Sequence, residues 1–260
     1  MQANEQAKLV EELILIVRDA GKLILEIYQS DFAVRDKQDD SPVTAADEQA
    51  EALILEGLRS LEWQFPVIAE EAHAAGKVPE VKECFWLVDP LDGTREFVNR
   101  NGEFTVNIAL IENGNPLLGV VLAPALGQLY AGSLGNGAFM EDHAGRRSIQ
   151  VRDASDSGLD VVASRSHGDA SALDLLLKGR KVKSLVSAGS SLKLCLIANG
   201  QADIYPRLGR TMEWDIAAGH AVLAAAGGQV QTLSGEPLKY GKDGFENPHF
   251  VASSGQPFLN

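Results

Sequence analysis

The chain has 260 residues, of which 45% are hydrophobic and 23% charged, a composition typical of an ordinary globular protein. Its 36 acidic residues outnumber 23 basic ones, and the resulting net charge of −13 argues against nucleic-acid binding and against attraction to anionic lipid. An acidic protein that binds an anionic substrate needs local positive charge, which a bound metal ion supplies. Two cysteines, Cys84 and Cys195, are too few for a disulfide framework or a zinc cluster.

The start of the chain lacks the basic-then-apolar order of a signal peptide, so we expect an intracellular, cytoplasmic protein. Residues 113–140 carry no charge, but glycines and prolines interrupt every apolar run before it reaches the ~18–20 residues of a spanning helix. We therefore expect strands and turns there, and no integral membrane segment.

The first half of the chain indicates helices on a sheet. Residues 5–30 place apolar side chains at helical spacing, and Thr44-Ala45-Ala46-Asp47 matches a capping box that opens a second helix to about Leu61. Strands are expected at 66–69 and 84–88, with a loop over 72–83, and the second strand stops at Asp89-Pro90. Further strands of an antiparallel sheet are expected at 104–112, 116–122, 128–133 and 138–141.

Residues 141–156 show no clear periodicity, which predicts a boundary between a first half, 1–150, and a second half, 151–260. Beyond it, strands alternate with helices. The expected strands are 160–164, 181–187, 203–205 and 228–232, and the expected helices are 170–179, 192–200 and 215–226. The sequence thus predicts an α/β protein, with α+β organisation in the first half and an α/β layer in the second.

The carboxylates carry the chemical information, because the chain contains no phosphate-binding glycine loop, dinucleotide fingerprint or nucleophile elbow. The segment Asp89-Pro90-Leu91-Asp92-Gly93-Thr94 takes a buried strand into a turn. Two carboxylates held three residues apart across a bend repel each other unless a cation lies between them. The bend also frees the Leu91 carbonyl, and ligation by oxygen alone suits Mg²⁺ or Mn²⁺ rather than zinc.

Other acidic residues also stand at the ends of elements. Glu70-Glu71 follows a strand, Asp47 belongs to the capping box, and Asp215 opens an alanine-rich helix after Trp214. Each alone is explained as a solvated face or a helix cap. Together they lie where α/β folds gather their sites. Gly93 lets the backbone approach a ligand closely, and if a helix begins at Thr94, the amides of Gly93 and Thr94 point toward an anion.

In this order and at these separations, the four acidic motifs resemble the signature set of the inositol monophosphatase superfamily of magnesium-dependent, lithium-sensitive phosphatases. The resemblance runs from the first helix to Gly227-Gly228 and implies a layered αβαβα sugar-phosphatase-like fold. Within the superfamily, the second half resembles the bacterial 3′(2′),5′-bisphosphate nucleotidase branch. The segments that carry this likeness are Gly189-Ser190-Ser191-Leu192-Lys193, Tyr205-Pro206-Arg207 and Gly219-His220-Ala221-Val222.

The resemblance implies two or three Mg²⁺ ions, with Asp89 bridging two of them. The implied metal ligands are Glu70, Asp89, the Leu91 carbonyl, Asp92 and Asp215. Thr94, paired with Asp47 and helped by Glu70, is implied to activate the attacking water. The same metal-site region is implied to contact the substrate, through Glu70, Leu91, Asp92, Gly93, Thr94 and Asp215.

A second phosphate needs partners of its own. The residues themselves offer a second anion site made of Lys193, Arg207 and the hydroxyls of Ser190 and Ser191. The resemblance implies hydrolysis of adenosine 3′,5′-bisphosphate to AMP and phosphate, and of its sulfated form, in sulfur metabolism. Some relatives are described as peripheral on the cytoplasmic face of the inner membrane, but the sequence shows no amphipathic anchor.

Alternatives remain open at this point. Inositol monophosphate, fructose 1,6-bisphosphate or the 2′-phosphate of NADP could be the substrate of the same metal site, and Glu213 could bind a polyol hydroxyl. A non-catalytic metal- or nucleotide-binding regulator is the alternative of another class, against which Asp47 and Thr94 argue. The sequence leaves open the residues that contact adenine and the oligomeric state.

Overall fold

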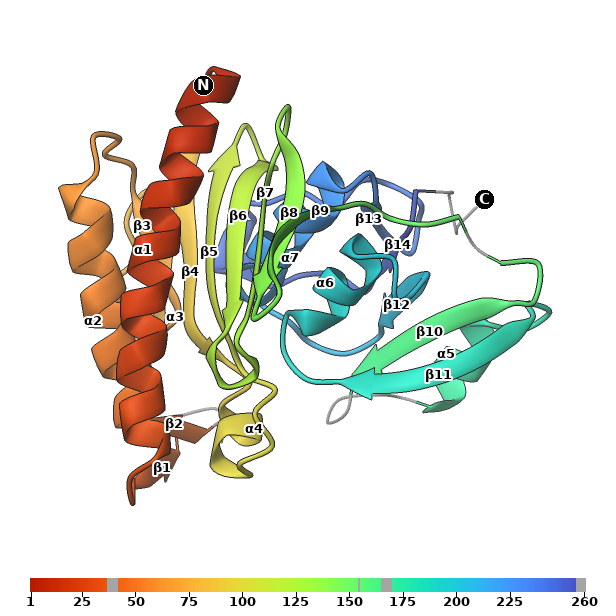
Figure 1. Ribbon diagram of the computed structural model, residues 1–260, viewed down its shortest axis with the longest axis horizontal. Coiled ribbons are helices and arrows are strands. Elements are labelled where there is room, and N and C mark those ends of the chain that lie inside the picture. The colour runs from red at the N-terminus through yellow and green to blue at the C-terminus, as the bar shows by residue number, and fades with distance from the viewer. Residues whose placement is uncertain (37–41, 154, 165–169, 256–260) are drawn as a thin grey trace.

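The computed structural model describes residues 1–36, 42–153, 155–164 and 170–255. Figure 1 shows successive layers. The helices α1 and α2 cover one face of a seven-stranded sheet, and α6 and α7 lie between this sheet and a five-stranded sheet. The helix α5 lies on the far side of the five-stranded sheet. This is the αβαβα order implied by the resemblance, so the predicted fold class is confirmed. No helix of the described segments is long and apolar enough to cross a membrane.

The outer helical layer consists of α1 (Ala3–Tyr28) and α2 (Ala45–Ser60). The apolar stripe of α1 is buried from Leu9 to Ile24, as its spacing predicts. Thr44 caps α2, because its hydroxyl accepts the Ala46 N–H and its own N–H donates to Asp47. Before this cap, β1 (Val34–Asp36) pairs with β2 (Pro42–Thr44), a short ribbon that periodicity does not predict.

The seven-stranded sheet has the order β3-β4-β5-β6-β7-β8-β9, in which only β3 and β4 are parallel. Its strands are β3 (Val67–Ala69), β4 (Cys84–Asp92), β5 (Thr105–Glu112), β6 (Asn115–Ala123), β7 (Gln128–Ser133), β8 (Gly137–Asp142) and β9 (Gly145–Ile149), and η1 (Pro124–Leu126) joins β6 to β7. The expected antiparallel sheet is confirmed. β9 is an addition inside the aperiodic segment, and its exposed side chains explain why no burial pattern marks it.

Helices cover this sheet on both faces. Trp86 and Val88 of β4 pack with α1 and α2, whereas Phe85 and Leu87 pack with α6 and α7. A strand buried on both faces reads as a continuous apolar run, as β4 does. The short helix α3 (Glu70–Ala74) follows β3, so the first residues of the predicted 72–83 loop are helical.

The five-stranded sheet has the order β11-β10-β12-β14-β13 and is mixed. Its strands are β10 (Leu159–Ser164), β11 (Val182–Ala188), β12 (Ile204–Arg207), β13 (Gln229–Thr232) and β14 (Phe250–Ser253), and its helices are α5 (Ala170–Leu176), α6 (Leu192–Ala198) and α7 (Glu213–Ala225). The last strand, β14, was not expected; η2 (Asp243–Phe245) precedes it and it pairs antiparallel with both β12 and β13.

The helix α7 packs directly on the seven-stranded sheet because two strand glycines leave room for it. A Cβ at Gly119 of β6 would lie 2.6 Å from the Ala218 carbonyl oxygen, and one at Gly132 of β7 would lie 2.8 Å from the Ala225 Cβ. Since α7 belongs to the second half, both halves contribute to one core. The shared core does not test the predicted division of the chain into halves 1–150 and 151–260, so that division stays a prediction.

Candidate active site

Asp89 and Asp92 lie at the end of β4, where a β-bulge interrupts its pairing with β5. Asp89 is opposite Asn107 and Asp92 is opposite Thr105, so three steps along β4 match two along β5. In a regular strand, residues three apart face opposite sides; the extra residue brings both carboxylates to one face. The strand continues to Asp92, so the predicted stop at Asp89-Pro90 is wrong.

The helix α4 (Thr94–Val98) begins at Thr94, which the sequence analysis treated only as a condition for anion binding, and it follows Gly93 in the left-handed conformation at φ 91°. The Thr94 hydroxyl lies 3.0 Å from Asp47 Oδ1 and 3.3 Å from the Leu91 carbonyl oxygen. Asp47 is 1% exposed, and its other oxygen accepts the N–H and the hydroxyl of Thr44. Burial raises the pKa of the Asp47 carboxyl. The structure thus brings the capping residue of α2 into contact with the first residue of α4.

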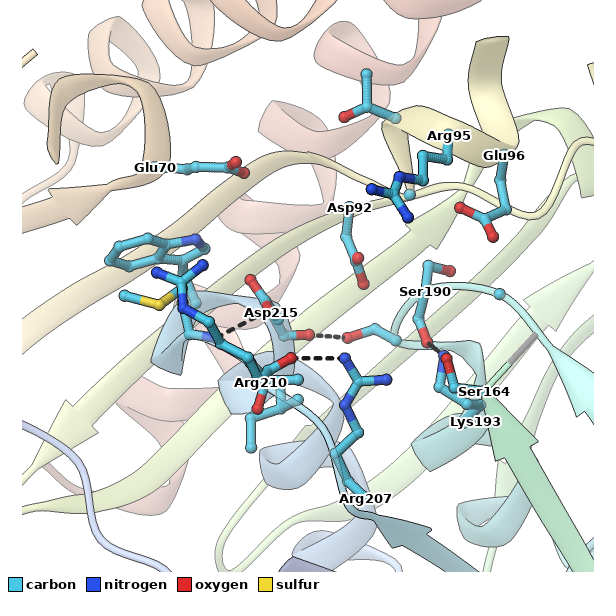
Figure 2. A pocket seen from close by; sticks show the side chains of 18 of the residues that line it. Glu70, Asp92, Arg95, Glu96, Ser164, Ser190, Lys193, Arg207, Arg210 and Asp215 are labelled. Atoms are coloured by element: carbon cyan, nitrogen blue, oxygen red, sulfur yellow. Dashed lines mark hydrogen bonds between the residues drawn. The ribbon is translucent and has the colours of Figure 1, made fainter. Parts of the chain in front are cut away.

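Glu70 at the start of α3 and Asp215 in the first turn of α7 approach the two aspartates of β4. Figure 2 shows Glu70, Asp92 and Asp215 turned toward one common space. Burial raises the pKa of Asp89 well above its usual range, and the charges of Glu70, Asp92 and Asp215 raise it further. Burial likewise raises the pKa of Asp215, to which the charges of Asp92 and Glu70 add. Four carboxylates that repel one another in this way form an oxygen-only donor set suited to a hard divalent cation.

The carboxylates do not form a closed ligand cage. Within the described part of the chain, no three His, Cys, Asp or Glu side chains are grouped closely enough to hold a metal ion as they stand. One oxygen of Asp215 accepts the Met212 N–H at 2.9 Å, so this side chain also caps its own helix.

A cavity of about 630 Å³ adjoins the carboxylates. The predicted site residues that line it are Glu70, Asp92, Gly93, Thr94, Ser190, Ser191, Lys193, Arg207 and Asp215. The remaining three, Asp47, Asp89 and Leu91, are each 1% exposed and lie behind its wall. The structure therefore gathers the predicted residues from both halves of the chain around one space.

The side of the cavity opposite the carboxylates carries the predicted second anion site, made of Lys193, Arg207, Ser190 and Ser191. Lys193 is 6% exposed and its Nζ donates to the carbonyl oxygens of Ala188 and Ser190, while burial lowers the pKa of its amine to about 8. Ser191 donates its hydroxyl to the Asp215 carbonyl at 2.6 Å. Arg207 donates one terminal nitrogen to the Arg210 carbonyl at 2.7 Å, but its Nε and the Ser190 Oγ are buried and have no hydrogen-bond partner among the residues that the structure describes. Lys193 and Ser191 thus bond to backbone carbonyls, whereas Arg207 and Ser190 each keep one polar atom that no described residue satisfies.

Glu213 does not face the cavity. Its carboxylate is fully buried and accepts the N–H groups of Gly241 at 2.8 Å and Lys242 at 2.9 Å. The Lys242 ammonium lies 2.6 Å from the same carboxylate. Glu213 thus anchors the loop before η2 to the start of α7, and it does not offer its oxygens to a polyol.

Several residues that line the cavity were not singled out from the sequence. They include His73, Arg95, Glu96, Ser164 and Arg210. His73 lies three residues beyond Glu70 on α3, a helical spacing that the loop predicted over 72–83 concealed. Arg95 and Glu96 follow Thr94 in α4, so the start of a helix at a suspected site was a signal for them.

Comparison with known proteins agrees with this geometry. The family described as "Inositol monophosphatase family" matches residues 5–256. The 3′(2′),5′-bisphosphate nucleotidase CysQ of Escherichia coli strain CFT073 is 47% identical over 248 residues, which cover 94% of this chain and 99% of that protein. The protein of the same name from Buchnera aphidicola is 42% identical over 258 residues, 96% of each chain.

Solved structures show the same relationship. CysQ from Bacteroides thetaiotaomicron, described as a bacterial member of the inositol monophosphatase family, has a TM-score of 0.81 and 36% identity, covering 96% of this chain and 98% of its own. An inositol monophosphatase from Anabaena has a TM-score of 0.76 and 26% identity, covering 98% and 93%. With the motifs, the layered fold and the matched length in agreement, the chain belongs to the inositol monophosphatase family.

Proposed function

We propose that this protein is a metal-dependent phosphatase that removes the 3′-phosphate of adenosine 3′,5′-bisphosphate, giving AMP and phosphate. The observation that carries the proposal is a single cavity with a carboxylate cluster on one side and the buried Arg207 on the other. A volume of about 630 Å³ is in the range of small-molecule sites. The names of the bacterial relatives support the same substrate.

The carboxylate side of the cavity would hold magnesium. Two or three ions would be ligated by the Leu91 carbonyl and four carboxylates, those of Glu70, Asp89, Asp92 and Asp215. Asp89 is central because the charges of the other three carboxylates all raise its pKa. Bound Mg²⁺ neutralises the phosphate oxygens, lowers the pKa of a bound water and stabilises the leaving oxygen. The bound Mg²⁺ ions would thus give this acidic protein the local positive charge that a phosphate ester requires.

Thr94 and Asp47 would handle the proton of the attacking water. The Thr94 hydroxyl lies 3.0 Å from Asp47, so it can pass its own proton to that carboxylate as it accepts one from the water. Burial raises the pKa of Asp47, which makes the carboxylate a better proton acceptor. Glu70 would assist from the cavity side. The backbone at Gly93 and Thr94 would contact the phosphate being transferred.

The second phosphate would bind on the opposite side of the cavity. Within the described part of the chain, Arg207 Nε and Ser190 Oγ have no partner, and a guanidinium forms strong charge-assisted bonds to phosphate. Lys193 and Ser191 would support this subsite by holding the backbone around Ser190 and by adding positive charge. The sulfated form of the nucleotide carries the same 3′-phosphate, so it is expected as a second substrate. A cytoplasmic location and a role in sulfur metabolism belong to this proposal.

The first test is phosphate release from adenosine 3′,5′-bisphosphate and from inositol 1-phosphate, side by side with Mg²⁺ and then with added Li⁺. Lithium-sensitive turnover of the nucleotide alone supports the proposal. Preference for the inositol ester would contradict the role given to Arg207 while retaining the metal site. Failure to hydrolyse either ester would contradict the proposed substrate.

A variant pair tests the second-phosphate subsite. Arg207→Gln should raise KM for adenosine 3′,5′-bisphosphate much more than KM for 3′-AMP, because 3′-AMP lacks the second phosphate. The control is Arg210→Gln, which removes a guanidinium from the exposed rim of the same cavity. Equal increases in KM for both nucleotides in the Arg207 variant would remove that residue from the subsite.

A further inference from the structure

The helix α2 carries two acidic side chains in its buried stripe. Asp47, Glu51, Ile54 and Leu58 are buried at helical spacing, and Glu51 is only 6% exposed. Asp47 meets Thr94, but Glu51 belongs to none of the motifs that mark the site. A carboxylate at this depth costs stability unless donors surround it.

The donors to Glu51 come from the first turn of α3. Its Oε2 accepts the Glu71 N–H at 2.7 Å, and its Oε1 accepts the Ala72 N–H at 2.8 Å. The first N–H groups of a helix have no partner within it. The residue that precedes α3 is Ala69, whose side chain makes no capping bond. Glu51 therefore caps α3 from a neighbouring helix, with both carboxylate oxygens.

This cap matters because α3 is short and begins with Glu70. A helix of five residues is not stable by itself, so its geometry depends on tertiary contacts. The two N–H groups that Glu51 holds directly follow Glu70. One face of α2 therefore contacts both the Thr94 hydroxyl, through Asp47, and the backbone that carries Glu70, through Glu51.

We propose that Glu51 is a positioning residue that holds Glu70 at the metal site, in a fixed place relative to Asp47 and Thr94. The inference rests on the proposed function, because that function makes Glu70 a metal ligand. Groups that orient a metal ligand typically affect metal affinity by roughly 10–100-fold when they are removed. Glu51 acts through the backbone, so the lower end of this range applies.

The experiment compares Glu51→Ala, Glu51→Gln and the control Glu56→Ala. Glu56 is an exposed carboxylate on the same helix, so its removal changes the charge of α2 without touching α3. Mg²⁺ binding is measured by calorimetry without substrate, and hydrogen exchange is followed in the peptide that contains Glu71 and Ala72. Phosphate release from adenosine 3′,5′-bisphosphate is titrated with Mg²⁺ in parallel.

Glu51→Ala should weaken Mg²⁺ binding about tenfold and speed exchange of the two amides. Glu51→Gln keeps one acceptor oxygen and should fall between this variant and the wild type, and Glu56→Ala should match the wild type. If Glu51→Ala does not fold, Glu51→Gln decides the question. If Glu51→Ala binds Mg²⁺ with an affinity within twofold of the Glu56→Ala control, the inference is overturned. If Glu51→Ala does not fold, the same result for Glu51→Gln overturns it.

Failure of the proposed function is a separate result. A wild-type protein that binds Mg²⁺ but releases no phosphate from the nucleotide contradicts the substrate assignment. The calorimetric and exchange measurements still decide the role of Glu51 in that case, because neither needs a substrate.

Discussion

Replacing Gly119 by alanine should displace α7 and with it the candidate metal ligand Asp215. A Cβ at Gly119 would lie 2.6 Å from the carbonyl oxygen of Ala218 and 2.8 Å from its Cα. Both atoms are backbone atoms of α7, so a side-chain rotation cannot relieve the clash. Asp215 lies three residues before Ala218 on the same helix.

The size of the effect follows from these distances. Ordinary contact begins at 3.4 Å, so α7 must move from β6 by about 0.8 Å. Overpacking of this kind costs about 1–3 kcal/mol of unfolding free energy, which lowers the Tm by roughly 2–12 °C in a chain of this length. A misplacement of about 1 Å at a catalytic centre can cost about 10²-fold in rate. We therefore expect Gly119→Ala to reduce kcat by about 10–100-fold at a temperature where the variant is folded.

The matched control is Gly21→Ala on α1. Its Cβ would also approach an atom at 2.6 Å, but that atom is the Leu122 Cδ2, on the face of β6 that α1 covers. Thermal unfolding and phosphate release per folded molecule are measured for both variants. Gly21→Ala should lose stability and keep its activity. Equal activity losses in the two variants, or full activity in Gly119→Ala, would refute the reasoning.

Three further changes test other parts of the structure. Thr94→Val removes the hydroxyl beside Asp47 at constant shape, so kcat should fall by about 10²–10⁴-fold at a temperature where the variant is folded. The Tm should fall as well, because the buried Asp47 loses a donor. Phosphate release within fivefold of the wild type would contradict the proton path. Asp92→Asn should abolish turnover and raise the Tm measured without metal, because burial raises the pKa of Asp92 and its charge is unfavourable in the folded state. Asp160 bonds to Ser184 and Lys183, which lower its pKa to about 2 from 3.8, so its stabilising effect is present above about pH 4 and is lost as the pH falls through about 2. The difference in unfolding free energy between the wild type and Asp160→Asn, followed by chemical denaturation, should shrink over that interval, and a constant difference would contradict the assignment.

The sequence predicts elements well where burial produces a regular pattern. The strand Gln128–Ser133 has the predicted bounds, and the first helix differs by two residues at each end, because both bury a regular set of apolar side chains. β9 leaves most side chains exposed, so it carries no such pattern. β14 is a four-residue strand whose place depends on pairing with β12, more than forty positions earlier in the chain.

In the candidate site, too, local patterns indicate some features, and others depend on tertiary contacts. Motif order alone indicated the acidic residues, because each stands where an element begins or ends. Whether Asp89 and Asp92 share a face depends on a bulge that the pairing with β5 creates. Glu213 and Glu70 are the same residue type, each at the first position of a helix, yet one is fully buried against the Lys242 loop and the other lines the cavity.

Local periodicity in the sequence indicates an α/β protein, and the resemblance of its motifs to known phosphatases implies the layered fold, the family and the candidate acidic residues. Tertiary packing determines which of those residues come together. Glycines at positions 119 and 132 let α7 approach the sheet, and Glu51 holds α3 beside α2. Such contacts join residues far apart in the chain, and their geometry depends on packing that no local pattern encodes.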